Sequence, residues 1–307
     1  MSPPQDQDYF ALRSPLHTPG LRVQQAGPDA WQIVEKWAAQ AGHNPGTGDF
    51  HHVWNLDSDG CFIGMLGDQP VSAISVINYN NGYTHLGSHL TAIKDPGAGI
   101  RLDTMRVAIQ HAGDHTIGVD ATTQDFNFYQ LAGFIPAWRT IRFTGPVPAE
   151  PPMHDHSCTN ITIPDMREMA ILDAECVLDT MAGRYQFALA IATAPDRHTL
   201  VATDRTARLR GYGVLRPAHH GYRIGPLYAQ DPRAATALFD ALCERAGRLG
   251  AKTITIDIPE TNHDARDLAE HRGLSHLGEA TRMYWSGRVE PRPADTRIYG
   301  LTSFETG

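Results

Sequence analysis

The stretch that most constrains the fold runs from Tyr83 to Ala112, where a strand pattern, a glycine turn and a helix pattern follow one another. β-Favouring residues at 84–93 predict a strand, and the run Asp95-Pro96-Gly97-Ala98-Gly99 predicts a tight turn. After the turn, apolar residues recur at three- and four-residue steps, which is the period of a helix with one buried face: Leu102, Met105, Ile109 and Ala112. The chain must therefore fold around a strand that leads through glycines into a helix.

A strand, a glycine turn and the start of a helix together form a site for anions. Unpaired backbone N–H groups converge there, and the helix dipole favours negative charge. Arg101 adds a formal positive charge beside them, so a phosphate group is the expected ligand. The alternative is that Gly97 and Gly99 serve packing alone, since short glycine motifs recur often by chance.

Length and charge narrow the class of protein. A chain of 307 residues predicts two domains of about 150 residues each. The net charge of -8 argues against nucleic-acid and anionic-membrane partners, because those attract basic patches. No apolar run is long enough to cross a bilayer, and the start MSPPQDQDYF has no signal-peptide core. The cysteines lack paired spacing, so reduced thiols and a cytoplasmic location are expected for Cys61, Cys158, Cys176 and Cys243.

The order of patterns along the chain indicates two similar halves. Residues 1–20 are a polar, proline-rich arm, and 21–146 form the first predicted domain. A proline-rich linker at 147–158 leads to a second domain at 159–307. Both domains show strands and helices in the same order, which we interpret as an internal duplication. The second lacks a glycine turn before its long helix at 231–249, and with it the phosphate-binding turn.

The segment after the glycine turn carries a family resemblance. Thr116 to Asp120 reads as the next strand, and Phe126 begins a short helix pattern that ends at Gly133-Phe134. With the strand, turn and helix before it, this order resembles the acetyl-coenzyme A binding half of the GNAT superfamily of acyltransferases. From Leu21 to the end, the chain is similar to bacterial tandem-GNAT proteins, through the loop 42–46, the runs GYGVLRP and GYRIGPL, and the tail YGLTSFE.

That resemblance implies an α/β fold of two GNAT-like domains. Each domain would have a mixed, mostly antiparallel central sheet flanked by helices. The N-terminal half would be the active acyltransferase, and the C-terminal half a degenerate copy that covers the cleft or completes the acceptor pocket.

The resemblance also implies how an acyl thioester would bind. Backbone groups of His89, Leu90 and Thr91 would bind the pantetheine amides, and one N–H would polarise the thioester carbonyl. The family's pyrophosphate loop, R/Q-x-x-G-x-G/A, corresponds here to Pro96, Gly97, Ala98, Gly99, Ile100 and Arg101. Pro96 replaces Arg or Gln and lacks an N–H, and Arg101 replaces a small residue. Arg101 can itself pair with a phosphate, and an acyl carrier protein brings only one phosphate, so both donors stay open.

Tyr129 falls where the family's thiolate-protonating tyrosine lies, four residues before Gly133. The alternative is a packing tyrosine on a buried helix face. The base that accepts the amine proton is left open between His89, Asp120 and His85.

In the family, the loop region after the first helix lines the acceptor pocket, which here points to His43, Asn44 and Trp54. Asp120 is a further candidate for binding the substrate. His85 and His89 share one face of a strand, and the linker holds His154-Asp155-His156 with Cys158. Packing and a solvated linker explain these histidines better than a metal does, so no metal is predicted.

The leading hypothesis is an N-acyltransferase. It would move an acyl group, acetyl being the first expectation, from a coenzyme A or carrier-protein thioester to the amine of a small molecule, by direct attack in a ternary complex. The main alternative is a non-catalytic GNAT-fold binding or sensor protein, and a metal-dependent hydrolase is a third. The expected partners are the small-molecule amine and, if the donor is a carrier-protein thioester, an acyl carrier protein. Neither nucleic acid nor a membrane is expected as a partner.

Overall fold

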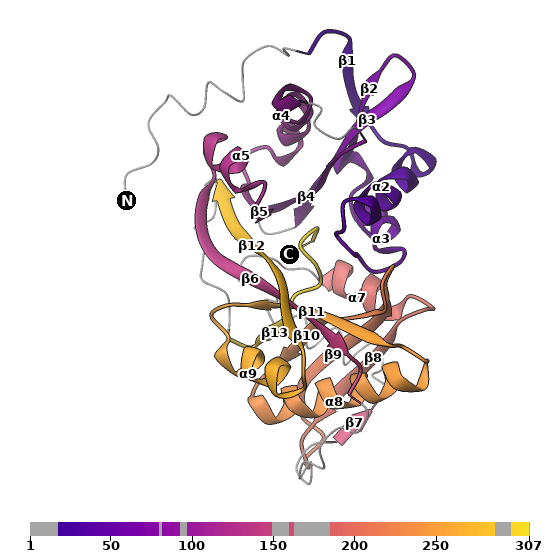
Figure 1. Ribbon diagram of the computed structural model, residues 1–307, viewed down its shortest axis with the longest axis vertical. Coiled ribbons are helices and arrows are strands. Elements are labelled where there is room, and N and C mark those ends of the chain that lie inside the picture. The colour runs from indigo at the N-terminus through magenta and orange to yellow at the C-terminus, as the bar shows by residue number, and fades with distance from the viewer. Residues whose placement is uncertain are drawn as a thin grey trace.

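The computed structural model describes residues 18–79, 82–92, 97–148, 160–162, 185–285 and 296–306. Within these residues all the strands join one sheet, in the order β1-β2-β3-β4-β5-β12-β6-β11-β10-β9-β8-β7, with β13 paired to β10. The molecule is elongated, with the N-terminal half above the C-terminal half in Figure 1. Most strand pairs are antiparallel, and the predicted α/β fold with a mixed, mostly antiparallel sheet is confirmed.

The elements of the N-terminal half follow the predicted patterns closely. Its strands are β1 (Leu21–Gln25), β2 (Cys61–Leu66), β3 (Gln69–Tyr79), β4 (Tyr83–Thr91), β5 (Thr116–Thr122) and β6 (Ile135–Pro146). Its α-helices are α2 (Pro28–Gln40), α3 (Asp49–Leu56), α4 (Gly97–Ala108) and α5 (Phe126–Leu131). Strand β3 was predicted to be an interior strand because both its faces are apolar. It lies between β2 and β4, and Val71 to Ile77 are buried.

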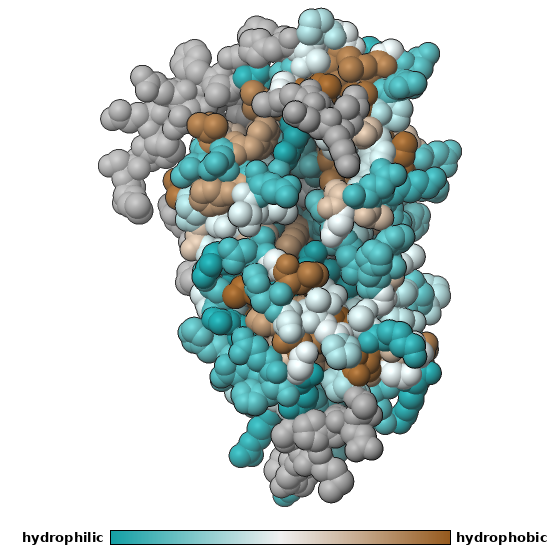
Figure 2. Space-filling model, in the orientation of Figure 1, coloured by the Kyte–Doolittle hydropathy of each residue, from teal (hydrophilic) through white to brown (hydrophobic). Residues whose placement is uncertain are grey.

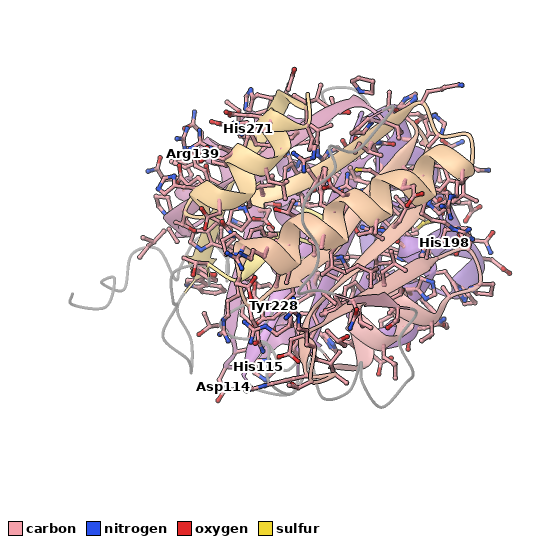
Figure 3. The ribbon with its side chains drawn as sticks, turned by 90° about the horizontal axis from the view of Figure 1, so that it is seen from below. Asp114, His115, Arg139, His198, Tyr228 and His271 are labelled. Atoms are coloured by element: carbon pink, nitrogen blue, oxygen red, sulfur yellow. The ribbon has the colours of Figure 1, made fainter. Side chains whose placement is uncertain are left out.

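The C-terminal half repeats this order. Its strands are β7 (Asn160–Thr162), β8 (His198–Thr203), β9 (Leu209–Pro217), β10 (Tyr222–Ala229), β11 (Thr253–Pro259), β12 (Ser275–Trp285) and β13 (Ile298–Gly300). Its helices are α7 (Tyr185–Thr193), α8 (Pro232–Arg248) and α9 (His263–His271). Figure 3 shows α8 and α9 lying across the sheet of this half. The helix pattern at 164–180 and most of the linker at 147–158 lie outside the described residues.

Helix α3 corrects the sequence prediction, which treated this region as loop. It begins after Gly48, whose φ of 77° is in the left-handed region that favours glycine. Phe50 and Val53 are buried in the core beside Trp31. The helix has only 8 residues, so its apolar positions are too few for the helical period to emerge from the sequence.

The two halves exchange their last strands. Strand β12 of the C-terminal half lies between β5 and β6, and β6 of the N-terminal half pairs with β11. Buried ion pairs join the exchanged strands to their hosts. Arg282 on β12 contacts both carboxylate oxygens of Asp120 on β5, at 2.9 and 2.8 Å. Arg142 on β6 contacts those of Asp257 on β11, at 2.7 and 2.9 Å. The two halves therefore share one continuous sheet.

Candidate active site

Strands β4 and β5 part in the middle of the sheet. They pair in parallel only where Tyr83–Leu86 faces Thr116–Val119. Just beyond, the register of β4 against β3 shifts, and Ser88 takes a φ of 52° that makes a bulge. On its other side β5 pairs with β12 along Ile117 to Thr122. The edge of β4 from Ser88 to Thr91 is thus freed from β5.

A cleft of about 790 Å³ lies at this parting. At one end it is lined by the free edge of β4, the start of α4 and the β5–α5 turn, with His89, Leu90, Thr91, Arg101 and 122–125. At the other end it is lined by the end of α2, by β6, by β12 and by the C-terminal tail, with Trp37, 40–43, Arg142, 277–279 and Phe304. Both halves therefore build it. Figure 2 shows the surface hollowed between the two halves, with mainly hydrophilic residues around the hollow.

The start of α4 has the features expected of a phosphate site. The helix begins at Gly97, and its first turn contains no acidic residue. Ile100 is buried with Leu21 and Val71, which anchors the first turn against β1 and β3. The backbone N–H groups of the first turn have no helical acceptors, so they are available to an anion. Pro96, the remaining residue of the predicted loop, lies outside the described residues.

The guanidinium of Arg101 is in contact with two neighbouring side chains, Asp125 and Phe128. Its Nη1 donates to Asp125 Oδ1 at 2.6 Å, and its guanidinium lies 4.7 Å from the centre of the Phe128 ring. Burial raises the pKa of Asp125, but Arg101 and a hydrogen bond from Thr122 outweigh it and lower that pKa overall. The carboxylate therefore stays ionised and holds Arg101. The role of Arg101 toward a phosphate stays a prediction.

His89 and Tyr129 form a hydrogen-bonded pair beside the cleft. His89 Nε2 lies 3.1 Å from the carbonyl oxygen of Arg101, which can only accept, so Nε2 carries the hydrogen. His89 Nδ1 then accepts from the Tyr129 hydroxyl at 2.8 Å. Burial, together with the charge of Arg101, lowers the pKa of His89 to about 3, so the imidazole is neutral.

Tyr129 itself is buried, and burial raises its pKa, so the phenol keeps its proton. The charge of Arg101 acts to lower this pKa but is outweighed by burial. The structure thus brings Tyr129, His89 and Arg101 together, although the sequence assigned them to two separate functions. The cleft is lined by His89, with Tyr129 behind it. The catalytic role of each stays a prediction.

The other two candidates for the base are held in structural contacts. Both carboxylate oxygens of Asp120 are engaged by Arg282. His85 is fully buried, with its ring between the Tyr83 hydroxyl and the carbonyl oxygen of Phe304, at 3.0 and 3.2 Å. Among the described residues, those that line the cleft include neither Asp120 nor His85.

Asn44 and Trp54 also lie away from the cleft lining in the described part of the chain. The Asn44 amide exchanges two hydrogen bonds with the backbone of His220, at 3.1 and 2.8 Å, and so ties the halves together. The Trp54 indole N–H donates to the carbonyl oxygen of Ala26 at 2.8 Å, because α3 turns this side chain toward the core. Their predicted part in acceptor binding has no support in this geometry.

The residues at the acceptor end that the sequence did not single out are Trp37, Gln40, Arg142, Glu279 and Phe304. Arg142 and Glu279 reach it on the exchanged strands β6 and β12, and Phe304 on the tail. Local patterns carry no signal for this placement. Only the tail motif, noted for its resemblance to tandem-GNAT proteins, could have pointed to Phe304.

The part of the chain that the structure describes was also expected to hold no metal and no membrane span. No group of three or more His, Cys, Asp or Glu side chains in that part of the chain is placed to hold a metal ion. None of the helices described there is long and apolar enough to cross a membrane.

Comparisons with known proteins agree with this architecture. Residues 169–300 match a family model described as an acetyltransferase (GNAT) domain. Over 284 residues the chain is 27% identical to a holothin acyltransferase of Pseudoalteromonas sp. (strain SANK 73390). The alignment covers 92% of this chain and 93% of that protein.

Two solved structures are similar over most of the chain. A putative acetyltransferase from Pyrococcus horikoshii has a TM-score of 0.73 at 22% identity, covering 95% of this chain and 98% of its own. A tandem GNAT protein from the clavulanic acid biosynthesis pathway has a TM-score of 0.64 at 14% identity, covering 88% and 100%. Both show the fold in the same two-half arrangement.

Proposed function

The chain belongs to the GNAT superfamily of acyltransferases, in tandem form, and from this premise we propose that it moves an acyl group from a thioester to the amine of a small molecule. The observation that carries the proposal is the parting of β4 from β5, which opens a free strand edge beside the start of α4 in one continuous cleft. The relative named as a holothin acyltransferase supports acyl transfer as the reaction class.

The donor that fits this end of the cleft is a coenzyme A thioester, with acetyl as the acyl group to test first. The edge of β4 beyond Leu86 faces the cleft and not β5, so its backbone groups would bind the amides of a pantetheine arm, and the first turn of α4 offers N–H groups for phosphate. A backbone N–H of β4 beside the thioester carbonyl would stabilise the negative charge that develops on its oxygen. The thioester of an acyl carrier protein is the alternative donor, because it needs only one phosphate contact.

Residues of the chain would then complete the transfer. The amine enters from the end lined by α2, β12 and the tail, and attacks the carbonyl carbon directly. We assign Tyr129 to supply the proton that the leaving thiolate takes up, which requires the hydroxyl to give up its hydrogen bond to His89 Nδ1. One observation favours the non-catalytic alternative: the Tyr129 hydroxyl is buried and already bonded to His89.

Calorimetric titration with coenzyme A and acetyl-CoA tests the donor site. Gly99→Asp places a carboxylate in the first turn of α4, where it repels phosphate, and we expect affinity to fall about 100-fold or more. Gly99→Asn is the matched control, because a Cβ at Gly99 meets Thr18 Oγ1 at 3.1 Å in both variants and only the charge differs. Equal affinities in the two variants would contradict a phosphate at this helix.

Thiol release from acetyl-CoA with a panel of primary amines, holothin among the acceptors, tests the reaction. Release that depends on an amine supports the transferase. Release only from an acyl carrier protein thioester assigns the donor to the carrier. Binding of acetyl-CoA without release for any acceptor favours the sensor protein.

A further inference from the structure

The C-terminal tail of the second half places a buried carboxylate, that of Glu305, directly after the cleft-lining residue Phe304. After β13 the tail passes Asp257 on β11, where the Leu301 N–H donates to the Asp257 carbonyl oxygen at 2.8 Å. It then runs to β4, where the Phe304 carbonyl oxygen lies 3.2 Å from His85 Nε2. A Cβ at Gly87 would overlap the carbonyl oxygen of Glu305, so a glycine lets the tail touch the β4 backbone. The end of the tail is therefore a built part of the N-terminal half.

The carboxylate of Glu305 is buried, with its Oε1 at 3.3 Å from Nδ1 of His43. Burial raises the pKa of this carboxyl group. The contact with His43 and the charges of Arg142 and Arg223 outweigh burial and lower the pKa to about 2. Glu305 is therefore an anion whose nearest imidazole is His43.

The backbone of His43 is clamped on both sides. Helix α2 ends at Gln40, Gly42 after it has a φ of 77°, and the His43 N–H donates to the Ala38 carbonyl oxygen at 3.0 Å. The His43 carbonyl oxygen accepts from Arg142 Nη1 at 2.6 Å. The ring lines the cleft, with 27% of its side chain exposed.

The 3.3 Å separation between His43 Nδ1 and Glu305 Oε1 is an ion-pair contact, and among the described residues neither carboxylate oxygen of Glu305 has a hydrogen-bond partner. A carboxylate can only accept, so we place the hydrogen of the His43 ring on Nδ1, facing Glu305, and the lone pair on Nε2. Among the described residues Nε2 of His43 has no hydrogen-bond partner. An imidazole directed by a buried carboxylate, with its other nitrogen free, is the arrangement in which histidine acts as a general base.

We propose that His43 is the general base of the acyl transfer and that Glu305 is its positioning residue. This rests on the transferase function proposed above. The amine nitrogen bonds to the thioester carbonyl carbon and gives its proton to His43 Nε2. The carbon–sulfur bond breaks, and the sulfur leaves with the electron pair and takes up a proton. The second half thus contributes to the chemistry of the first through its last residues.

The base predicted from the sequence lay among His89, His85 and Asp120, and His43 differs from all three. Both ring nitrogens of His89 are bonded, to Tyr129 and to the Arg101 carbonyl. His85 supports the tail, and Asp120 supports β12. His43 combines a place on the cleft lining with a free ring nitrogen.

The test compares the wild type with His43→Gln, His43→Ala and Glu305→Gln in the thiol-release assay, with acetyl-CoA and the amine panel that includes holothin. For His43→Gln we expect kcat to fall about 100-fold or more, with the KM for acetyl-CoA changed less than about twofold. Added imidazole should raise the rate of His43→Ala at least about tenfold, since it replaces the missing base. Glu305→Gln should lower kcat about tenfold or more, because the tautomer is no longer imposed.

Controls separate the base from other causes of inactivity. His51→Gln, an exposed α3 histidine bonded to Asn55, should keep the wild-type rate. Acetyl-CoA affinity by calorimetry reports whether each variant is folded, and ¹⁵N spectra of the wild-type histidines report the His43 tautomer without any acceptor. If the wild type acylates an amine and His43→Gln acylates it equally fast, the assignment of His43 as the base is wrong, but the transferase function stands. Hydrogen on Nε2 of His43 would overturn this assignment too. A wild type inactive with every amine and donor would overturn the transferase and the base together.

Discussion

Strand β4 parts from β5 after Leu86 in the N-terminal half, and in the C-terminal half β10 stops pairing with β11 after Arg223. The first parting opens into the cleft. The second is filled by the chain's own tail, because β13 pairs with β10 and Leu301 bridges to Asp257. A parted pair of strands leaves backbone groups without partners, and they must find water, a ligand or the chain itself. The same local geometry is thus an open cleft in one half and a structural joint in the other.

The helices that follow these partings differ in the same way. Helix α4 begins without an acidic residue in its first turn. Helix α8 is capped by Asp231, whose carboxylate accepts from the Ala234 N–H at 3.0 Å and also pairs with Arg210 at 2.6 Å. A carboxylate already occupies the place where a phosphate would bind. This supports the interpretation of the second half as a degenerate copy.

The largest effect on the free energy of unfolding is expected where the C-terminal tail fills the gap between β10 and β11. Leu301 is buried beside Trp138 and Ile298, so Leu301→Ala should lower the free energy of unfolding by about 2–5 kcal/mol. Leu277→Ala is the matched control, because this side chain is 62% exposed, and we expect a change within about 0.5 kcal/mol. Urea unfolding measures both. Similar small losses in the two variants would mean that the tail does not close the parting in solution.

An intermediate effect on stability is expected beside the cleft between β4 and β5, where His89 is buried as a neutral ring. Its pKa is lowered to about 3 from 6.5, so protonation favours the unfolded chain. Its contribution to stability is complete above pH 6.5 and is lost as pH falls toward 3. The wild type should therefore lose about 2 kcal/mol between pH 6.5 and pH 5 relative to His89→Gln. Parallel stability curves for the two proteins over this range would show that His89 stays solvated.

The smallest effect is expected at the cap of α8. Asp231→Ala should cost about 1 kcal/mol, because the Ala234 N–H loses its acceptor, whereas Asp231→Asn keeps an acceptor and should cost less. Neither variant should gain affinity for coenzyme A in calorimetry, since β13 still fills the parting. Coenzyme A bound by a protein that carries both Asp231→Asn and Gly99→Asp would show that the capping carboxylate alone distinguishes the two helices.

Local patterns in the sequence predicted the strand and the helix at one end of the cleft. The strand, glycine turn and helix at 83–112 depend on propensities and periods that act over a few residues, and the structure has β4 and α4 there. The free edge of β4 was placed at His89 to Thr91 by resemblance, and the bulge at Ser88 opens it there.

The sequence by itself determined which residues form strands and helices, and that β3 is an interior strand, because these follow from nearest neighbours and apolar periods. Only the tertiary structure decided that β6 and β12 change places, that the tail fills one parting, and that Glu305 meets His43. Two similar halves offer equivalent strand edges, so apolar patterns alone cannot choose between a strand's own half and the other. That choice depends on contacts between residues far apart in the chain, such as Arg282 with Asp120 and Arg142 with Asp257.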